Sequence, residues 1–226
     1  MVRYAYIHGF ASGPLSAKGL YLAEAFAACG TTLLLPDLNV PTFAAMTFTS
    51  ILDELDRIHA GEQDGTVWRL AGSSLGGYIS ARWAALHPDR VDRLVLLCPG
   101  LDLRSRWEEI LGVDEVRLWK LRGYHEVADH SGELHPLSWK IVEDAANHPS
   151  YPEVRCPTRI IHGTGDTIVP LEYSHRYLEF NRLRASPAEM ELVEVDDDHS
   201  LENCRPQIAD LCRGWLGSAS KLDEFR

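Results

Sequence analysis

Short apolar runs alternate along the chain with longer stretches in which apolar residues recur at helical spacing. The short runs are rich in β-branched and large apolar side chains and predict six strands, at Val2–Ile7, Thr32–Leu35, Val67–Ala71, Leu94–Leu97, Arg159–Ile161 and Met190–Val195. The longer stretches predict helices at Ala17–Ala28, Thr49–Ala60, Leu75–Leu86, Leu171–Leu183 and Gln207–Leu216. The strands lack strict apolar–polar alternation, which agrees with burial on both faces. The pattern therefore predicts an α/β fold with about six mostly parallel strands and helices on both faces.

The interval over residues 98–155 interrupts this rhythm, because it contains no obvious central strand. Its periodicity predicts short helices at Ser105–Leu111, Asp114–Leu121 and Ser138–Ala146, and a small hairpin at Tyr124–Ala128 and Glu133–Leu137. The interval also holds three tryptophans, Trp107, Trp119 and Trp139. No internal repeat, low-complexity segment or long linker separates a second unit. We therefore predict a single domain over residues 1–226, with residues 98–155 as a cap insertion within it.

The composition is that of a soluble globular domain with an acidic balance. The 226 residues are 45% apolar and 24% charged, and 33 acidic against 22 basic residues give a formal net charge of −11. Since no cluster of lysines and arginines is present to neutralise phosphates, we expect no nucleic-acid partner. The longest uninterrupted apolar stretch, Leu94–Pro99, is far shorter than the roughly 18 residues of a membrane span, and Met1–Phe10 lacks the apolar centre of a signal peptide. Five scattered cysteines without a C-x-x-C pair predict a cytoplasmic location, with no disulfide framework and no zinc site.

Residues 72–76 read Gly-Ser-Ser-Leu-Gly and match the pattern G-x-S-x-G with Ser74 at its centre. A serine on a sharp turn from strand to helix needs very small residues two positions away on each side, because the two backbones nearly collide there. A predicted strand precedes the motif and a predicted helix follows it, which favours Ser74 as a nucleophile over a chance match. With Ser73 as the nucleophile both flanking glycines would be lost. A phosphate-binding loop would need a Lys-Ser or Lys-Thr pair after the glycines, and none is present.

A serine hydroxyl becomes an effective nucleophile when a histidine takes its proton and a carboxylate orients that histidine. In one large class of α/β enzymes these residues follow in the order serine, acid, histidine, each on a loop after a strand. Asp166 lies in a glycine-rich turn after one predicted strand, and His199 lies just after the next. Asp102, in the loop after an earlier strand, is the alternative acid. The three aspartates at 196–198 are interpreted as solvated charge.

Two backbone N–H groups are needed to hold the negative oxygen of a tetrahedral intermediate. One is expected from Leu75, the residue after the nucleophile, beside the positive end of the following helix. The second is expected from Phe10, because His8-Gly9 makes a permissive turn directly after the first predicted strand. These two residues are our candidates for an oxyanion hole.

Metal and cofactor chemistry is not indicated by the sequence. Three histidines of the interval lie near one another, but their spacing matches no standard ligand motif and no cysteine accompanies them: His125, His130 and His135. We therefore predict chemistry that needs neither a metal nor a cofactor.

With these residues in place, the chain resembles small α/β-hydrolases and is most similar to the YqiA-like bacterial esterases. Three stretches carry the resemblance: His8-Gly9-Phe10 with Ser12–Lys18, Gly72–Gly77, and His162–Asp166 with Val169-Pro170. The resemblance implies an α/β-hydrolase fold and a cofactor-free serine hydrolase acting on ester or thioester bonds of small acyl substrates. It also implies Ser74 as nucleophile, Asp166 as acid, His199 as base, and the N–H groups of Phe10 and Leu75 as the oxyanion hole. Because the chain starts at the strand before the oxyanion loop, we expect a sheet without the two preliminary strands of larger relatives.

The expected reaction is hydrolysis through an acyl-enzyme intermediate. Within the same fold, an acyl thioesterase, a carbon–carbon bond hydrolase and a peptidase are alternatives, and a non-catalytic ligand-binding protein is an alternative of another class. A serine at position 74 disfavours epoxide hydrolase or dehalogenase chemistry, which resembles this fold but uses an aspartate nucleophile. The predicted partner is a small acyl substrate; the sequence does not define its chain length or the oligomeric state. The three tryptophans either pack on the sheet or line an acyl pocket.

Overall fold

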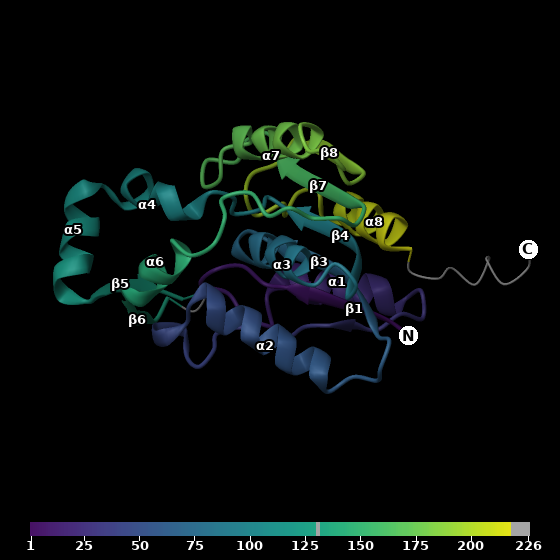
Figure 1. Cartoon of the computed structure of the whole chain (residues 1–226), viewed down its shortest axis with the longest axis horizontal. Coiled ribbons are helices and arrows are strands. Elements are labelled where there is room, and N and C mark those ends of the chain that lie inside the picture. Colours follow the sequence, from purple (N-terminus) through teal and green to yellow (C-terminus); the bar gives the residue numbers. More distant parts are fainter. Residues whose placement is uncertain (130–131, 218–226) are drawn as a thin grey trace, which may run out of the picture.

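A computed structural model of the protein describes residues 1–129 and 132–217 and has a six-stranded sheet at its centre (Figure 1). The strands are β1 (Val2–Ile7), β2 (Leu33–Leu34), β3 (Val67–Ser73), β4 (Val91–Leu97), β7 (Thr158–Gly163) and β8 (Met190–Val195). They lie in the order β2-β1-β3-β4-β7-β8, and all neighbouring pairs are parallel. The predicted parallel sheet is therefore confirmed, and the carboxyl ends of its strands share one edge.

Helices cover both faces of the sheet. On one face lie α1 (Ala17–Ala27) and α8 (Arg205–Leu216), and on the other lie α2 (Phe48–Ala60), α3 (Leu75–Leu86) and α7 (Glu172–Arg182). Along β4, Leu94 and Leu96 belong to one core cluster while Val95 and Leu97 belong to the other, and all four side chains are fully buried. Burial on both faces explains why these strands show no apolar–polar alternation. None of the helices that the structure describes is long and apolar enough to cross a membrane.

Local contacts fix where the elements begin and end. The helix α2 begins after Thr47, whose side chain accepts a hydrogen bond from Ser50 N–H, while the Ser50 hydroxyl accepts one from Thr47 N–H. This reciprocal cap explains why α2 begins one residue before the predicted position. The strand β2 is shorter than predicted, because only Leu33 and Leu34 pair with β1. A short 3-10 helix, η1 (Phe43–Ala45), was not predicted.

The chain between β4 and β7 forms a separate layer beyond the carboxyl ends of the strands (Figure 1). It contains α4 (Leu103–Leu111), α5 (Val113–Arg122), the antiparallel pair β5 (Tyr124–Ala128) and β6 (Leu134–Ser138), and α6 (Lys140–Ala145). Ser138 was predicted to begin a helix, but it ends β6 because it pairs with Tyr124. The Trp119 ring packs edge-on against Trp107 and Trp139, each at 5.4 Å between ring centroids. A tryptophan cluster thus forms the core of this layer.

Candidate active site

Ser74 lies between the end of β3 and the start of α3, in a strained backbone conformation. Its φ and ψ angles are 54° and −121°, a region that L-residues rarely adopt, and its N–H donates to Leu97 O at 2.9 Å. The two glycines of the motif are required by contact. A Cβ on Gly72 would lie 2.3 Å from the carbonyl oxygen of Gly76, and one on Gly76 would lie 2.1 Å from that of Ile7. The close approach of strand and helix inferred from the motif is therefore found at Gly72, whereas Gly76 is required because α3 packs on the end of β1.

Substitution of Gly76 by alanine is expected to destabilise the protein by about 3 kcal/mol or more, because the added Cβ meets backbone atoms of β1 that cannot move without separating β1 from α3. The matched control is Gly214→Ala in α8, where an added Cβ meets nothing within 4 Å and helix propensity predicts a gain of up to about 1 kcal/mol. Urea unfolding of the two variants measures both effects. Equal stability of the two variants would contradict the contact argument.

The loop after β1 passes close to Ser74 at Gly9. A Cβ built on Gly9 would lie 3.2 Å from the Cβ of Ser74, so only a glycine leaves ordinary space there. Phe10, Ser74 and Leu75 line the same cavity. Leu75 is the first residue of α3, and the first N–H groups of a helix have no intrahelical acceptor. The two candidate oxyanion residues thus flank Ser74.

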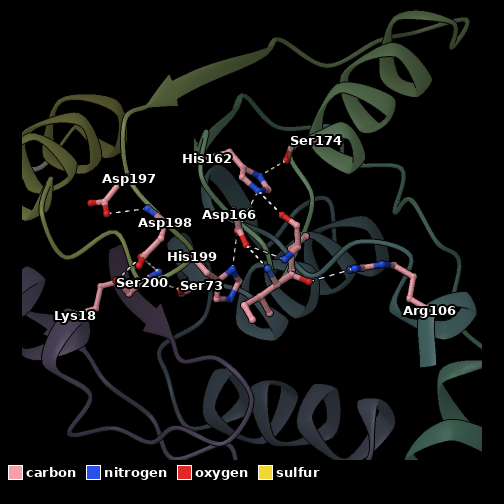
Figure 2. A network of polar contacts seen from close by, with 12 residues as sticks. Lys18, Ser73, Arg106, His162, Asp166, Ser174, Asp197, Asp198, His199 and Ser200 are labelled. Carbon is pink, nitrogen blue, oxygen red and sulfur yellow. Dashed lines mark hydrogen bonds and ion pairs between the residues drawn. The ribbon is translucent and has the colours of Figure 1, made fainter. Parts of the chain in front are cut away.

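Asp166 and His199 form a hydrogen-bonded pair (Figure 2). The His199 Nδ1 lies 2.7 Å from Asp166 Oδ2, while Asp166 Oδ1 accepts from the N–H groups of Ile168 at 2.9 Å and Val169 at 2.8 Å. The Asp166 side chain is fully buried, and that of His199 is 24% exposed. Burial alone would raise the pKa of Asp166, but hydrogen bonds from His162, His199 and Val169 N–H outweigh it and hold this pKa well below its usual range. The carboxylate therefore stays ionised and orients the His199 ring.

The structure brings the predicted acid and histidine together, and it places Ser74 at the carboxyl end of β3 on the same edge of the sheet. Within residues 1–129 and 132–217, no hydrogen bond joins Ser74 Oγ to His199. The alternative acid, Asp102, immediately precedes α4 without a side-chain hydrogen bond to the helix, and its carboxylate accepts a hydrogen bond from the Ser150 hydroxyl. Asp102 is therefore committed elsewhere, and the contact to His199 belongs to Asp166.

One of the three aspartates before His199 is not solvated, contrary to the sequence interpretation. Asp197 is 6% exposed and accepts hydrogen bonds from Asp198 N–H, Cys204 N–H and the Asn203 side chain. These contacts tie the loop that carries His199 to the start of α8. The pattern of three consecutive acids gave no indication of this, because it does not distinguish a loop anchor from an exposed charge.

Two further polar residues contact the site and were not singled out by the sequence. His162, at the end of β7, approaches the same Asp166 oxygen as His199, at 3.2 Å from Oδ2 (Figure 2). The Lys18 ammonium of α1 donates to Ser73 Oγ at 3.0 Å, directly beneath the serine turn. Burial lowers the pKa of Lys18, and nearby acidic groups including Asp166 oppose this effect. The position of His162, at a strand end and four residues before the acid, is a signal that could have been used.

A largely apolar cavity of about 360 Å³ adjoins Ser74. The core fold contributes Phe10, Ser74 and Leu75, and the layer between β4 and β7 contributes the other wall, including Trp107, Trp119 and Val127. Two of the three tryptophans thus line the cavity while also packing on one another. A second cavity, of about 440 Å³, lies between α2 and the first strands and contains none of the candidate catalytic residues.

Arg106 links this layer to the loop of the acid. Its guanidinium is buried, with 3% of the side chain exposed, and donates to Glu109 Oε1 at 2.7 Å and to Ile168 O at 3.2 Å (Figure 2). On the other side of the site, ring contacts join Phe10 to Phe43 at 5.5 Å and Phe43 to His135 of β6 at 5.4 Å. The layer therefore contacts the acid loop directly and is connected to Phe10 of the oxyanion loop through Phe43 of η1.

Two groups of side chains in the described chain have the spacing of metal ligands. In the first, the ligand atoms of Cys98, Asp166 and His199 lie within 4.8 Å of one another, but both Asp166 oxygens already accept hydrogen bonds. The second consists of three residues around the turn of the β5–β6 hairpin, Asp129, Glu133 and His135. The three histidines rejected as metal ligands from their spacing in the sequence form a different group, and one of them, His130, lies outside the described residues. Metal-independent chemistry stays a prediction.

Comparison with solved structures places this architecture among the α/β hydrolases. The α/β hydrolase domain-containing protein 10 from mouse superposes with a TM-score of 0.73 at 21% identity, covering 93% of this chain and 89% of that one. Est1E from Butyrivibrio proteoclasticus gives a TM-score of 0.72 at 20% identity, covering 95% and 86%. The predicted α/β-hydrolase fold is therefore confirmed. Residues 3–213 match the sequence model of the uncharacterised protein family UPF0227, and the chain belongs to this family, which confirms the resemblance to YqiA-like proteins.

Sequence comparison finds relatives that hydrolyse acyl bonds. The palmitoyl-protein thioesterase ABHD10 of Rattus norvegicus, a mitochondrial protein, is 27% identical over 157 residues, which are 67% of this chain and 50% of that protein. The monoacylglycerol lipase abhd6-A of Xenopus laevis is 26% identical over 196 residues, 84% of this chain and 53% of that protein. The chain thus spans about half the length of these curated relatives. The relatives are esterases, thioesterases and lipases of one fold.

Proposed function

We propose that the protein is a serine hydrolase that cleaves carboxylic ester or thioester bonds of acyl substrates. One observation carries the proposal: the buried, ionised Asp166 holds His199 by Nδ1, so that the other ring nitrogen is free to act as a base. The order of Ser74, Asp166 and His199 along the chain and the hydrolytic relatives support the same conclusion.

In this proposal His199 takes the proton of the Ser74 hydroxyl as the oxygen attacks the substrate carbonyl, and the negative Asp166 stabilises the imidazolium that forms. His199 then returns the proton to the leaving alcohol or thiol, which leaves an acyl-Ser74 ester. Water, deprotonated by His199, attacks this ester, and His199 then returns that proton to the Ser74 oxygen as the carboxylic acid is released. Catalytic hydrogen bonds are commonly long in free enzymes and tighten with substrate, which fits the absence of a Ser74–His199 bond in the described chain. The steps require neither a metal nor a cofactor.

The N–H groups of Phe10 and Leu75 are proposed to hold the oxyanion. Leu75 N–H stands at the positive end of the α3 dipole, where negative charge is stabilised. Phe10 lies on the turn that Gly9 allows to pass close to Ser74. The strained Ser74 backbone supports this assignment, because it aims the side chain out of the turn toward the cavity.

The residues 98–155 are proposed to cap the site and to select the acyl group. Their apolar wall over Ser74, with Trp107 and Trp119, fits a hydrocarbon chain better than a charged or strongly polar group. The relatives, a palmitoyl-protein thioesterase and a monoacylglycerol lipase, support acyl chains as the substrate class. A cytoplasmic location stays our prediction from the scattered cysteines.

The test is a panel of acyl esters and acyl thioesters of increasing chain length, combined with labelling by a fluorophosphonate probe. We expect covalent labelling at Ser74 and a maximum in kcat/KM at an intermediate chain length, because a cavity of about 360 Å³ accommodates a limited number of methylene groups. Hydrolysis of peptides but not of esters or thioesters would favour the peptidase alternative. Binding of the acyl compounds without labelling or turnover would favour the non-catalytic alternative.

Substitution of Val127 by phenylalanine is expected to move the preferred acyl chain to a shorter length, because Val127 lines the cavity and the larger ring fills part of it. We expect the rate for the longest accepted chain to fall about tenfold or more, the effect of one or two methylene groups that no longer fit. The matched control is Leu134→Phe on the neighbouring strand, where the side chain is 61% exposed. An unchanged chain-length profile in the Val127 variant would place the acyl group elsewhere.

A further inference from the structure

His162 is a second histidine in contact with the carboxylate of Asp166. Its side chain is fully buried at the end of β7. The Nδ1 atom lies 2.7 Å from the hydroxyl of Ser174 in α7, and the Nε2 atom lies 2.9 Å from Val169 O and 3.2 Å from Asp166 Oδ2. Both ring nitrogens are therefore occupied, and the ring bridges α7 to the loop of the acid (Figure 2).

The partners of His162 define where its proton lies. The carbonyl of Val169 and the ionised carboxylate of Asp166 can only accept hydrogen bonds, so Nε2 must carry a hydrogen. The Ser174 hydroxyl can donate to an unprotonated Nδ1 or accept from a protonated one. With the hydroxyl as the donor, the ring is the Nε2–H tautomer, whose N–H is shared between Val169 O and Asp166 Oδ2.

We propose that His162 is a positioning residue of the hydrolase: it donates to Asp166 Oδ2, fixes the carboxylate in the plane that His199 needs, and shares that oxygen with His199. This inference rests on the proposed function of Asp166 and His199. His162 itself touches no substrate in this scheme, because its side chain is enclosed and both of its nitrogens are occupied. The contacts then run from His199 to Asp166, from Asp166 to His162 and from His162 to Ser174, with Ser74 as the proposed nucleophile beside His199.

Because His162 and His199 share Asp166 Oδ2, the loss of one contact changes the proton affinity of Asp166 and of its remaining partner. Each hydrogen bond donated to a carboxylate stabilises its negative charge and weakens the hydrogen bond that a second donor makes to the same oxygen. Removal of His162 leaves Asp166 more basic and strengthens its hold on the protonated His199. The other titratable groups that interact with Asp166 come from different elements, Lys18 of α1 and Cys98 at the end of β4, and a substitution at position 162 leaves both in place. The pH profile should therefore respond to His162 in one direction.

The first experiment measures kcat/KM against pH for His162→Leu and Ser174→Ala, on an ester that the wild-type protein hydrolyses. For His162→Leu we expect a loss of roughly 10- to 100-fold at the optimum, from misplacement of the acid, and an upward shift of the acidic limb by about 0.5 pH unit. For Ser174→Ala we expect a smaller shift in the same direction. The matched control is Tyr177→Phe, on the same helix, which loses a buried hydrogen bond to Pro152 O but leaves Asp166 untouched; its acidic limb should not move.

The second measurement does not depend on activity. Nitrogen NMR of the protein labelled with ¹⁵N-histidine should show one histidine, lost in His162→Leu or assigned through Ser174→Ala, with a protonated Nε2 and an unprotonated Nδ1. A protonated Nδ1 at His162, or an unmoved acidic limb in active Ser174→Ala and His162→Leu, would overturn the proposal. If His162→Leu does not fold, Ser174→Ala and the tautomer decide the question. A wild-type protein without hydrolase activity would instead contradict the proposed function, while the tautomer would remain measurable.

Discussion

Replacement of Ser74 by alanine is expected to reduce turnover of a short-chain chromogenic ester by about 10⁴- to 10⁶-fold and to abolish labelling by a fluorophosphonate. The hydroxyl is the attacking group in the proposed mechanism, and no other group stands at the same place on the turn. The fold should remain intact, because the Ser74 side chain caps no helix and forms no hydrogen bond in the part of the chain that the structure describes. Thermal unfolding alongside the rate measurement checks this point.

The matched control is Ser73→Ala, one residue earlier in the same turn. The Ser73 hydroxyl points to the opposite side and accepts a hydrogen bond from Lys18, so its loss should affect stability more than chemistry. Labelling of the Ser73 variant should persist. Retained turnover in the Ser74 variant, or loss of labelling in the Ser73 variant alone, would show that the nucleophile has been misassigned.

Replacement of Asp166 by asparagine is expected to lower turnover by about 10⁴-fold. The amide oxygen of asparagine can still accept from the N–H groups of Ile168 and Val169, and this leaves its NH₂ group facing His199 and His162. The NH₂ group would then face the ring N–H groups of His199 and His162, which are also donors. His199 would lose both its orientation and the negative charge that stabilises its protonated form. Steady-state kinetics of the purified variant measure the loss.

Asp102→Asn is the matched control for the acid. The Asp102 carboxylate accepts a hydrogen bond from Ser150 and makes none to α4, so the isosteric change should keep activity within about tenfold of the unmodified protein. A large loss in the Asp102 variant together with a small one in the Asp166 variant would exchange the two roles. The pair of variants thus tests an ambiguity that the sequence leaves open, since both aspartates follow strands at the same edge.

The fold could be predicted from the sequence because periodicity and burial agree along most of the chain. The strands β1 and β8 and the helix α3 have the predicted bounds. The differences lie where tertiary contacts decide: β2 is shortened by the extent of its pairing with β1, and Ser138 joins β6 through its partner Tyr124. The order of the strands in the sheet is likewise a property of packing rather than of any one segment.

The candidate site could be predicted only where the role of a residue depends on its neighbours in the sequence, and not where it depends on partners from other elements. Gly72 reports a contact with the carbonyl of Gly76 that is local in sequence, so the spacing of the two glycines is informative by itself, whereas the contact of Gly76 with Ile7 is not visible in the motif. The roles of His162 and Asp197 depend on partners that come from other elements, Ser174 in one case and Cys204 in the other. An aspartate within a run of three acids carries no mark of such partners, and the position of His162 at a strand end near the acid does not reveal that Ser174 is its other partner. The same holds for the cavity, whose walls come from segments that are distant in the chain.

The contact of Arg106 with Ile168 O has a consequence for how such a protein can acquire new substrates. Helix α4 forms a wall of the cavity, and through Arg106 it also holds the loop whose N–H groups fix Asp166. A change of pocket shape on α4 is therefore also a change in the support of the acid. Exchange of this layer between homologues to transfer selectivity should keep the arginine and its Glu109 partner as a unit. The described residues of the β5–β6 hairpin form no hydrogen bond with the acid loop, so the hairpin wall is the place where the pocket can change without altering the support of Asp166.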